Sequence, residues 1–415
     1  MNVLKIATAG SVDDGKSTLI GRILYDTKSL TEDKLQAIRE KSKQRGFDYL
    51  DFSLATDGLV AEREQGITID VAHIYFSTLN TSFIIADTPG HIEYTRNMVT
   101  GASNSQVSIV LVDARNGVVE QTYRHFFINN LLRVKDIIIA VNKMDLVEYS
   151  EEKFNQIKEE IKFIADKSGY QNQNIKFVPI SALHGDNVVE KSTKISWYTG
   201  KSLLEYLEGL HLNDTQDYSQ TRFPIQTVIR PKTENYHDFR GYAGKLYGGD
   251  LAVGDKVTVL PSGTNSTIKK IHFFDKEYQV GKKGSSVNIT LKDDVNISRG
   301  DMLVKQGEEP KIVRELDATI CWMDKTPLKL ADKYYIKHGV NEAQVKITGL
   351  SSLIHTDFSG KQDQPEQLSL NEIGEISLKT SKSLFVDSFK ENKANGTFIL
   401  INTKTNNTAG VGFIK

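Results

Sequence analysis

Hydrophobic positions divide the chain into two parts with different periodicity. Up to about residue 210, short apolar runs alternate with longer segments in which apolar residues recur every three or four positions. The short runs predict buried strands, and the longer segments predict amphipathic helices. Such an alternation predicts an α/β domain, built on a mostly parallel sheet with helices on both faces.

The predicted elements of this first part follow one another with short connections. The strands are 3–7, 83–86, 137–141 and 177–180, and the helices are 17–24, 31–43, 120–133, 151–167 and 201–207. In the helix over 151–167, the apolar residues Phe154, Ile157 and Ile161 share one face, and the charges between them fit a solvated face. The polar stretch 213–221 predicts a linker, so we expect the first domain to span residues 1–211.

From Arg222 onward the pattern changes to short alternating strands that are broken by glycine turns. The first set runs through 224–229, 241–247, 256–260, 266–273 and 286–291, and the second through 315–322, 334–338, 343–354, 373–378, 396–401 and 411–414. Many short strands at regular spacing predict closed all-β barrels. We therefore expect two barrel domains, over residues 220–308 and 309–415.

Composition and charge narrow the class of protein. Hydrophobic residues make up 39% and charged residues 25% of the chain, as in ordinary soluble proteins. The single cysteine, Cys321, excludes an internal disulfide and is expected in the core beside Trp322. Because the first predicted strand begins at Val3 and no apolar run reaches ~18 residues, we expect a cytoplasmic protein without a membrane span. A net charge of −1 gives no general attraction to nucleic acid.

A phosphate-binding loop lies between the first predicted strand and helix, where residues 10–17 read GSVDDGKS. Its two glycines let the backbone curl so that successive N–H groups face an anion. Lys16 is placed to span the β- and γ-phosphates of a nucleotide, and Ser17 offers a hydroxyl to Mg²⁺. The loop predicts a nucleoside triphosphate as ligand.

Two further strings select guanine. Residues 142–145 read NKMD and follow a predicted strand, and residues 181–183 read SAL and follow the next one. The carboxylate of Asp145 can accept both N–H donors of guanine, from N1 and from the exocyclic amine, and adenine has no such pair. The SAL backbone would contact the guanine oxygen. Because each string stands at a strand end and in this order, we expect GTP as the nucleotide.

The string DTPGH at residues 87–91 follows another predicted strand. Asp87 at the strand end would face the metal, and the N–H group of Gly90 would meet the γ-phosphate. Both groups would therefore sense the third phosphate.

These motifs, the string GITID at 66–70 and one nucleotide-binding domain followed by two β-barrels resemble the translation-factor class of GTPases. Elongation factors of that class typically have histidine where this chain has Asp14. The strings at 13–22, 92–98, 197–200 and 239–244 are similar to the GTP-hydrolysing large subunits of bacterial sulfate adenylyltransferases. The resemblance covers essentially the whole chain.

The resemblance implies a division of labour between two subunits. A small adenylyl-transferring subunit joins sulfate to the AMP moiety of ATP, which makes adenylyl sulfate and pyrophosphate for cysteine synthesis. This chain would hydrolyse GTP to drive that reaction, with Mg²⁺ as cofactor and with the small subunit as partner in a heterodimer or larger assembly. No second phosphate loop follows residue 17, so we expect no fused adenylyl-sulfate kinase activity.

The resemblance also assigns the hydrolytic residues. His91 would orient the attacking water, and Val12 and Ile67 would be apolar residues on its path. Thr68 and Lys16 complete the catalytic set. The remaining histidines, such as His73, His125, His184 and His338, have no spacing typical of metal ligands and are expected to be ordinary polar or core residues.

The expected metal ligands are Ser17 and Thr68, with Asp87 acting through a metal-bound water. Thr68 would then close the switch segment only when the γ-phosphate is present. The expected nucleotide-binding residues are Gly10, Ser11, Val12, Asp13, Asp14, Gly15, Lys16, Ser17, Thr18, Gly66, Ile67, Thr68, Ile69, Asp70, Asp87, Thr88, Pro89, Gly90, His91, Asn142, Lys143, Met144, Asp145, Ser181, Ala182 and Leu183.

Two other functions stay open at this point. An elongation-factor-like GTPase would handle tRNA, but the near-neutral charge and Asp14 argue against nucleic acid as a partner. A non-catalytic GTP-binding assembly protein would keep the pocket without needing His91, and only kinetics would separate it. The polar segment 25–64 is interpreted as a solvated switch region rather than as a dedicated docking surface.

Overall fold

The computed structural model of the 415-residue chain describes residues 3–44, 46–55, 71–89, 95–103, 105–168, 173–210, 220–231, 239–274 and 276–415. The chain divides into two compact units. One comprises Met1–Leu212 with His355–Gly360, and the other comprises Asn213–Ile354 with Lys361–Lys415. In these described ranges, no helix is both long and apolar enough to cross a membrane.

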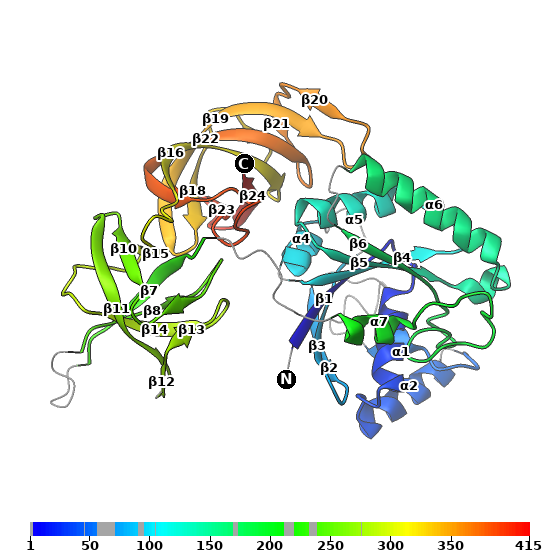
Figure 1. Ribbon diagram of the computed structural model, residues 1–415. Coiled ribbons are helices and arrows are strands. Elements are labelled where there is room, and N and C mark those ends of the chain that lie inside the picture. Colours follow the sequence, from blue (N-terminus) through cyan, green and yellow to red (C-terminus); the bar gives the residue numbers. More distant parts are fainter. Residues whose placement is uncertain are drawn as a thin grey trace. The chain divides into compact units, whose positions relative to one another are not determined.

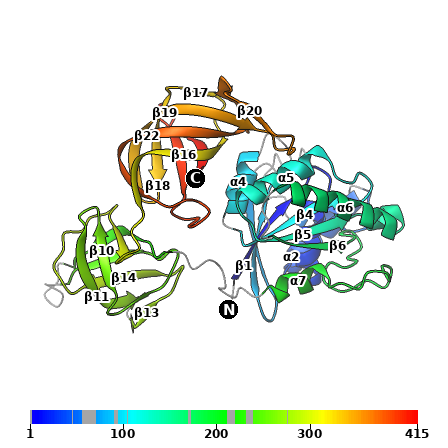
Figure 2. The same ribbon diagram turned by 45° about the horizontal axis from the view of Figure 1, so that its top comes forward.

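The first unit is a layered α/β structure (Figure 1). Its elements are β1 Val3–Ala9, α1 Lys16–Asp26, α2 Glu32–Gln44, η1 Phe52–Ala55, β2 Ala72–Ser77, β3 Ser82–Asp87, α4 Thr95–Ser103, β4 Val107–Asp113, α5 Glu120–Leu131, β5 Asp136–Asn142, η3 Met144–Val147, α6 Glu151–Lys167, β6 Asn174–Pro179 and α7 Leu203–Gly209. The sheet order is β2-β3-β1-β4-β5-β6, and only β2 runs antiparallel to its neighbour. Helices α4, α5 and α6 cover one face of this sheet, and α1 and α7 the other (Figures 1 and 2).

Burial explains why the inner strands read as continuous apolar runs. All seven residues of β4 are buried, and so are six of the seven in β5, because helices cover both faces of the sheet. The edge strand β2 instead alternates exposed and partly buried residues. The four predicted strands and five predicted helices of this unit are confirmed with small shifts at their ends, whereas β2, β4 and α4 were not predicted.

Helix ends in this unit carry the caps that their sequences favour. Ser150 precedes α6, and its hydroxyl accepts a hydrogen bond from the N–H group of Lys153 at 3.3 Å. Helix α6 has the predicted bounds, and Phe154, Ile157, Ile161 and Ile164 are its buried residues. Ser202 and Glu205 form a reciprocal capping box at the start of α7, with bonds of 2.7 and 3.2 Å.

The second unit consists of two β-barrels, each closed by six main strands and flanked by short additional ones. The first contains β7 Phe223–Ile229, β8 Gly241–Lys245, β9 Leu251–Ala252, β10 Lys256–Leu260, β11 Thr264–Phe273, β12 Lys276–Tyr278, β13 Val280–Gly281, β14 Ser286–Leu291 and β15 Met302–Lys305. The second contains β16 Lys311–Trp322, β17 Leu328–Lys329, β18 Lys333–His338, β19 Asn341–Ile354, β20 Lys361–Asp363, β21 Gln367–Leu368, β22 Ile373–Val386, β23 Thr397–Asn402 and β24 Thr408–Ile414.

Strand pairing closes each barrel on itself. In the first, the order β10-β15-β7-β8-β14-β11 returns to β10, and in the second, β18-β23-β24-β16-β22-β19 returns to β18. Each encloses its own apolar core, with Phe223 and Leu303 in the first and Trp322 and Leu400 in the second. Cys321 is buried in β16, as predicted. The predicted barrel architecture is confirmed, although β15 and the short strands were not anticipated.

A buried polar network joins the two barrels, and we call it the Arg222 network. The guanidinium of Arg222 is fully buried and donates two hydrogen bonds of 2.8 Å to the carboxylate of Asp387. Its other N–H groups reach the carbonyl oxygens of Thr221 and Glu308 and the side chain of Gln220. Asn395 adds a donor to Asp387 at 2.8 Å. Every donor of this guanidinium is satisfied, as a buried charge requires.

Candidate nucleotide-binding site

Four loops meet at one edge of the sheet in the first unit. They follow the carboxyl ends of β1, β3, β5 and β6, which lie in the same sheet and in parallel. In parallel α/β sheets, ligands bind at this edge, where connecting loops diverge. The described residues of the phosphate loop, the Asp87 strand end, the NKMD string and the SAL string are thereby brought to one edge.

The phosphate loop depends on glycine at its entry to helix α1. Gly15 has φ = 93°, in the left-handed region, and a Cβ atom there would lie 2.5 Å from Nδ2 of Asn142. Asp13 shares this region with φ = 69°. The carboxylate of Asp14 accepts the N–H group of Ser11 at 2.6 Å, and burial raises the pKa of that carboxyl group. This local bond holds the loop in its curled form.

Lys16 lies inside this curl. Its side chain is buried, and its ammonium group donates to the carbonyl oxygens of Gly10 and Ser11 at 2.8 Å each. Burial lowers the pKa of Lys16, although the nearby charge of Asp87 favours the protonated form. Because carbonyl oxygens compensate an ammonium charge only in part, an anion bound in the loop would stabilise it further.

Asn142 connects three of the four loops. Its Nδ2 donates to the carbonyl oxygen of Asp14 at 2.7 Å, and its Oδ1 accepts the N–H group of Ala182 at 2.9 Å. The asparagine is buried at the end of β5. It therefore fixes the phosphate loop and the SAL string relative to the NKMD string.

Lys143 adds a second connection to the phosphate loop. Its ammonium group donates to the carbonyl oxygen of Asp13 and lies 2.9 Å from the carboxylate of Asp113 at the end of β4. Arg115 pairs with the same carboxylate at 2.7 Å. Burial acts to raise the pKa of Asp113, but hydrogen bonds from Arg115 and Lys143 outweigh it and lower that pKa to about 2. Asp113 was not predicted as part of the site, although its position at the end of an apolar run indicates the end of a strand.

Asp145 has the geometry that guanine recognition needs. Its side chain is 14% exposed, and its Oδ1 is buried without a hydrogen-bond partner among the residues that the structure describes. The other oxygen lies 3.8 Å from Nε2 of the half-exposed His184. A buried carboxylate oxygen without a donor is unfavourable unless a ligand supplies one, and guanine supplies two.

The SAL string is held against helix α1. Ser181 and Ala182 are buried, and the N–H group of Ser181 donates to the carbonyl oxygen of Asp186 at 3.1 Å. The carbonyl oxygen of Leu183 accepts from Arg22 of α1 at 3.3 Å. We define the guanine pocket by Asn142, Asp145, Ser181 and Ala182.

Hydrogen bonds among Tyr149, Asp186, Ser192 and Trp197 support this pocket and were not found from the sequence, and we call these residues the brace. The hydroxyl of Tyr149, which follows the NKMD string, donates to the carboxylate of Asp186 at 2.7 Å, beyond the SAL string. Trp197 donates its indole N–H to the carbonyl oxygen of Tyr149 at 2.9 Å, and Ser192 donates to Asp186 at 2.6 Å. Burial and the Asp186 carboxylate raise the pKa of Tyr149. The brace ties together the two loops that form the base pocket.

The phosphate side of the site offers oxygen atoms. Asp87 is buried at the end of β3, and Oδ1 of its carboxylate accepts the Thr8 hydroxyl at 3.2 Å. The Thr88 hydroxyl donates to the carbonyl oxygen of Thr8, and Ser17 stands partly exposed in the first turn of α1. Carboxylate and hydroxyl oxygens are the donors that Mg²⁺ prefers, so this set fits that ion.

Several predicted site residues lie outside the described part of the chain. They are Gly66, Ile67, Thr68, Ile69, Asp70, Gly90 and His91. The expected roles of Thr68 in metal binding and of His91 in hydrolysis therefore stay predictions.

Comparison with known proteins supplies the family. Residues 1–213 match the family model described as elongation factor Tu GTP binding domain, and residues 315–415 match the one described as GTP-eEF1A C-terminal domain-like. Sulfate adenylyltransferase subunit 1 of Bacteroides fragilis is 47% identical over 415 residues, which span 100% of this chain and 86% of the relative. The chain belongs to the sulfate adenylyltransferase subunit 1 family.

Other relatives agree with this membership. The bifunctional enzyme CysN/CysC of Mycobacterium tuberculosis is 47% identical over 413 residues, 99% of this chain and 67% of that protein. Among solved structures, the Ski7 GTPase-like domain of S. cerevisiae has a TM-score of 0.54 at 17% identity and covers 100% of this chain and 97% of that domain. That likeness shows the fold, a P-loop GTPase domain followed by two barrels, and the predicted fold class is confirmed.

Proposed function

We propose that this chain is the GTP-hydrolysing subunit of a sulfate adenylyltransferase, in which GTP hydrolysis drives the joining of sulfate to the AMP moiety of ATP. Family membership supports the overall reaction. The observation that carries the GTP assignment is the buried oxygen of Asp145, which has no hydrogen-bond partner among the described residues and lies in a loop fixed by Asn142. Two N–H donors on one edge of guanine meet that carboxylate, and adenine cannot supply them.

The phosphate loop binds the triphosphate in this proposal. Lys16 donates to the β- and γ-phosphate oxygens, and backbone N–H groups of residues 11–17 line the same anion. Ser17, Thr68 and Asp87 would hold Mg²⁺, which when bound neutralises phosphate charge. Asp87 would hold the metal from the end of β3, which pairs with the strand that precedes the phosphate loop.

Hydrolysis is assigned to His91 as the group that orients the attacking water, with Val12 and Ile67 on the path of that water. Thr68 reports the presence of the γ-phosphate through the switch segment, which changes conformation when the phosphate leaves. These roles rest on resemblance of the motifs.

Energetic coupling requires that the partner subunit distinguish the GTP form of this chain from the GDP form. GTP hydrolysis can drive another reaction only if the partner binds the GTP and GDP forms with different free energies, since equal affinity shifts no equilibrium. The sequence contains one phosphate loop, and its base pocket suits guanine. Adenylyl transfer from ATP is therefore assigned to a separate, small subunit, and the assembly is cytoplasmic.

The test is GTP turnover by the chain in complex with the small adenylyl-transferring subunit. We expect slow turnover by the chain alone and a rise when the small subunit, ATP and sulfate are all present, because the switch responds to the state of the partner. Omitting sulfate gives the matched control and should abolish the rise. Turnover that responds to ribosomes instead of to these substrates would favour the elongation-factor-like alternative.

A further inference from the structure

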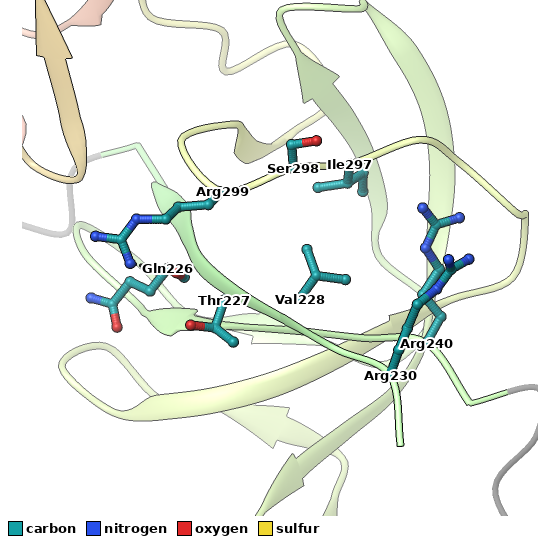
Figure 3. Close-up of a pocket in the computed structure, with 8 residues that line it drawn as sticks. All are labelled: Gln226, Thr227, Val228, Arg230, Arg240, Ile297, Ser298 and Arg299. Carbon is teal, nitrogen blue, oxygen red and sulfur yellow. Dashed lines mark hydrogen bonds between the residues drawn. The ribbon is translucent and has the colours of Figure 1, made fainter. Parts of the chain in front are cut away.

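A second pocket lies in the first barrel, within the second unit. Its volume is about 490 Å³. It is lined by Gln226, Thr227, Val228, Arg230, Arg240, Ile297, Ser298 and Arg299. These residues come from β7, from the approach to β8 and from the segment before β15 (Figure 3). None of them belongs to the phosphate loop or the guanine pocket, so GTP binding leaves this pocket unexplained.

Three of the eight lining residues are arginines. In Figure 3, Arg230 and Arg240 are drawn at one end of the pocket and Arg299 at the other. Arg299 is oriented by a hydrogen bond of 2.9 Å to the carbonyl oxygen of Gln226. In the described part of the chain, neither Arg230 nor Arg299 has a carboxylate partner within ion-pair distance.

Among the described residues, acidic groups near the pocket compensate only part of this charge. Asp294 lies 2.5 Å from Nη1 of Arg240, but its side chain is 84% exposed, so solvent weakens the pair. The carboxylate of Asp301 accepts the N–H group of Ser298 at 2.8 Å. Guanidinium groups that line one pocket repel each other, and an anion bound in the pocket would reduce that repulsion.

Arg240 also has a donor that no described residue satisfies. Its Nε is buried without a hydrogen-bond partner, and its guanidinium lies 5.9 Å from the ring of Tyr242. The hydroxyl of Tyr242 is itself fixed by a 3.0 Å bond to the carbonyl oxygen of Val295. Arg240 is therefore held in place by a rigid ring while one of its N–H groups lacks an acceptor.

From this arrangement we infer that the pocket binds a small oligophosphate anion of the pyrophosphate type. An arginine fork donates hydrogen bonds to two oxygens of a phosphate at once, and converging arginines suit a ligand with several charged oxygens. The hydroxyls of Thr227 and Ser298 add donors around the pocket. The volume lies in the range of small-molecule sites, and the chain's net charge of −1 gives no wider attraction to a polyanion.

The test is calorimetric titration of inorganic pyrophosphate into the full chain at low ionic strength. The chain is first saturated with GDP, because an empty phosphate loop would also bind the probe. The double variant Arg230→Gln/Arg299→Gln removes two exposed guanidinium groups and leaves the partly buried Arg240 in place. We expect one binding event in the parent and an affinity at least about tenfold lower in the double variant.

Arg314→Gln is the matched control, since Arg314 is an exposed arginine of the other barrel, and it should bind pyrophosphate like the parent. Unchanged unfolding temperatures establish that the variants fold. The inference is overturned if the GDP-saturated parent does not bind pyrophosphate, or if the double variant binds it as tightly as the parent. A single-stranded RNA that binds the same arginines more tightly than pyrophosphate would also overturn it.

Discussion

Buried polar side chains in the Arg222 network and in the guanine pocket serve opposite purposes. Every N–H group of Arg222 has an acceptor, and Asp387 accepts from both Arg222 and Asn395. In the guanine pocket, Asp145 keeps a buried oxygen without a donor in the described part of the chain. A satisfied network stabilises the pair of barrels. An unsatisfied buried group instead favours the binding of a ligand that supplies the missing donor.

This contrast predicts that breaking the Arg222 network damages the fold. Arg222→Met leaves the Asp387 carboxylate buried without its cation, which should lower the free energy of unfolding by about 3–5 kcal/mol. Replacing both partners, as in Arg222→Met/Asp387→Leu, should recover most of that loss. Urea unfolding of the full chain measures both variants. If the single variant were as stable as the parent, this network would not hold the barrels together.

The guanine pocket should respond in the opposite way. Asp145→Asn should leave the unfolding midpoint near that of the parent, because no buried cation pairs with the carboxylate in the part of the chain that the structure describes. It should lower GTP affinity by about 10²-fold or more and shift preference to xanthosine triphosphate, whose C2 carbonyl can accept from the new amide. Competition binding of the two nucleotides measures the shift. Unchanged binding of both would remove Asp145 from base recognition.

The roles proposed for His91 and Lys16 predict that hydrolysis and nucleotide binding can be impaired separately. His91→Ala should leave GTP affinity nearly intact and slow single-turnover hydrolysis by at least about 10²-fold, since the group acts on the water in the transition state. Lys16→Ala should instead weaken nucleotide binding, because the proposal assigns its ammonium group to the β- and γ-phosphates. Equal hydrolysis rates for His91→Ala and the parent would contradict the assignment.

The smallest effect concerns the brace behind the guanine pocket. Tyr149→Phe removes one hydrogen bond to Asp186, so GDP affinity should fall by roughly threefold to tenfold. Tyr75→Phe is the matched control, because Tyr75 is 69% exposed on the edge strand β2. Measuring GDP dissociation constants for both variants sharpens the comparison. An equal loss in the two variants would show that the brace does not position the pocket.

Sequence periodicity predicted much of this architecture for a physical reason. Apolar spacing records which face of an element is buried, so helix α6 and the strands beside the phosphate loop were found with small errors in their ends. The candidate motif residues could be named from the sequence because phosphate and base recognition require fixed residue types at strand ends, and their roles stay predictions. Strand β2 was missed because an edge strand that is half exposed carries a weak apolar pattern.

The residues that could not be predicted from the sequence are those whose interaction partners lie far away in the sequence. Arg222 and Asp387 are 165 positions apart, and Tyr149 and Asp186 are 37 apart. Asp113 likewise pairs with Lys143 across two neighbouring strands. Local patterns indicate burial but not which polar groups meet, so these interactions emerge only from the three-dimensional fold.

In the proposed function, GTP hydrolysis supplies free energy to sulfate activation. The most direct measurement of this coupling is the yield of adenylyl sulfate from ATP and labelled sulfate, formed by this chain with the proposed small adenylyl-transferring subunit in the presence of GTP or of a non-hydrolysable GTP analogue. We predict a higher equilibrium yield with GTP, because only hydrolysis can shift an unfavourable reaction. Equal yields with GTP and with the analogue would contradict energetic coupling.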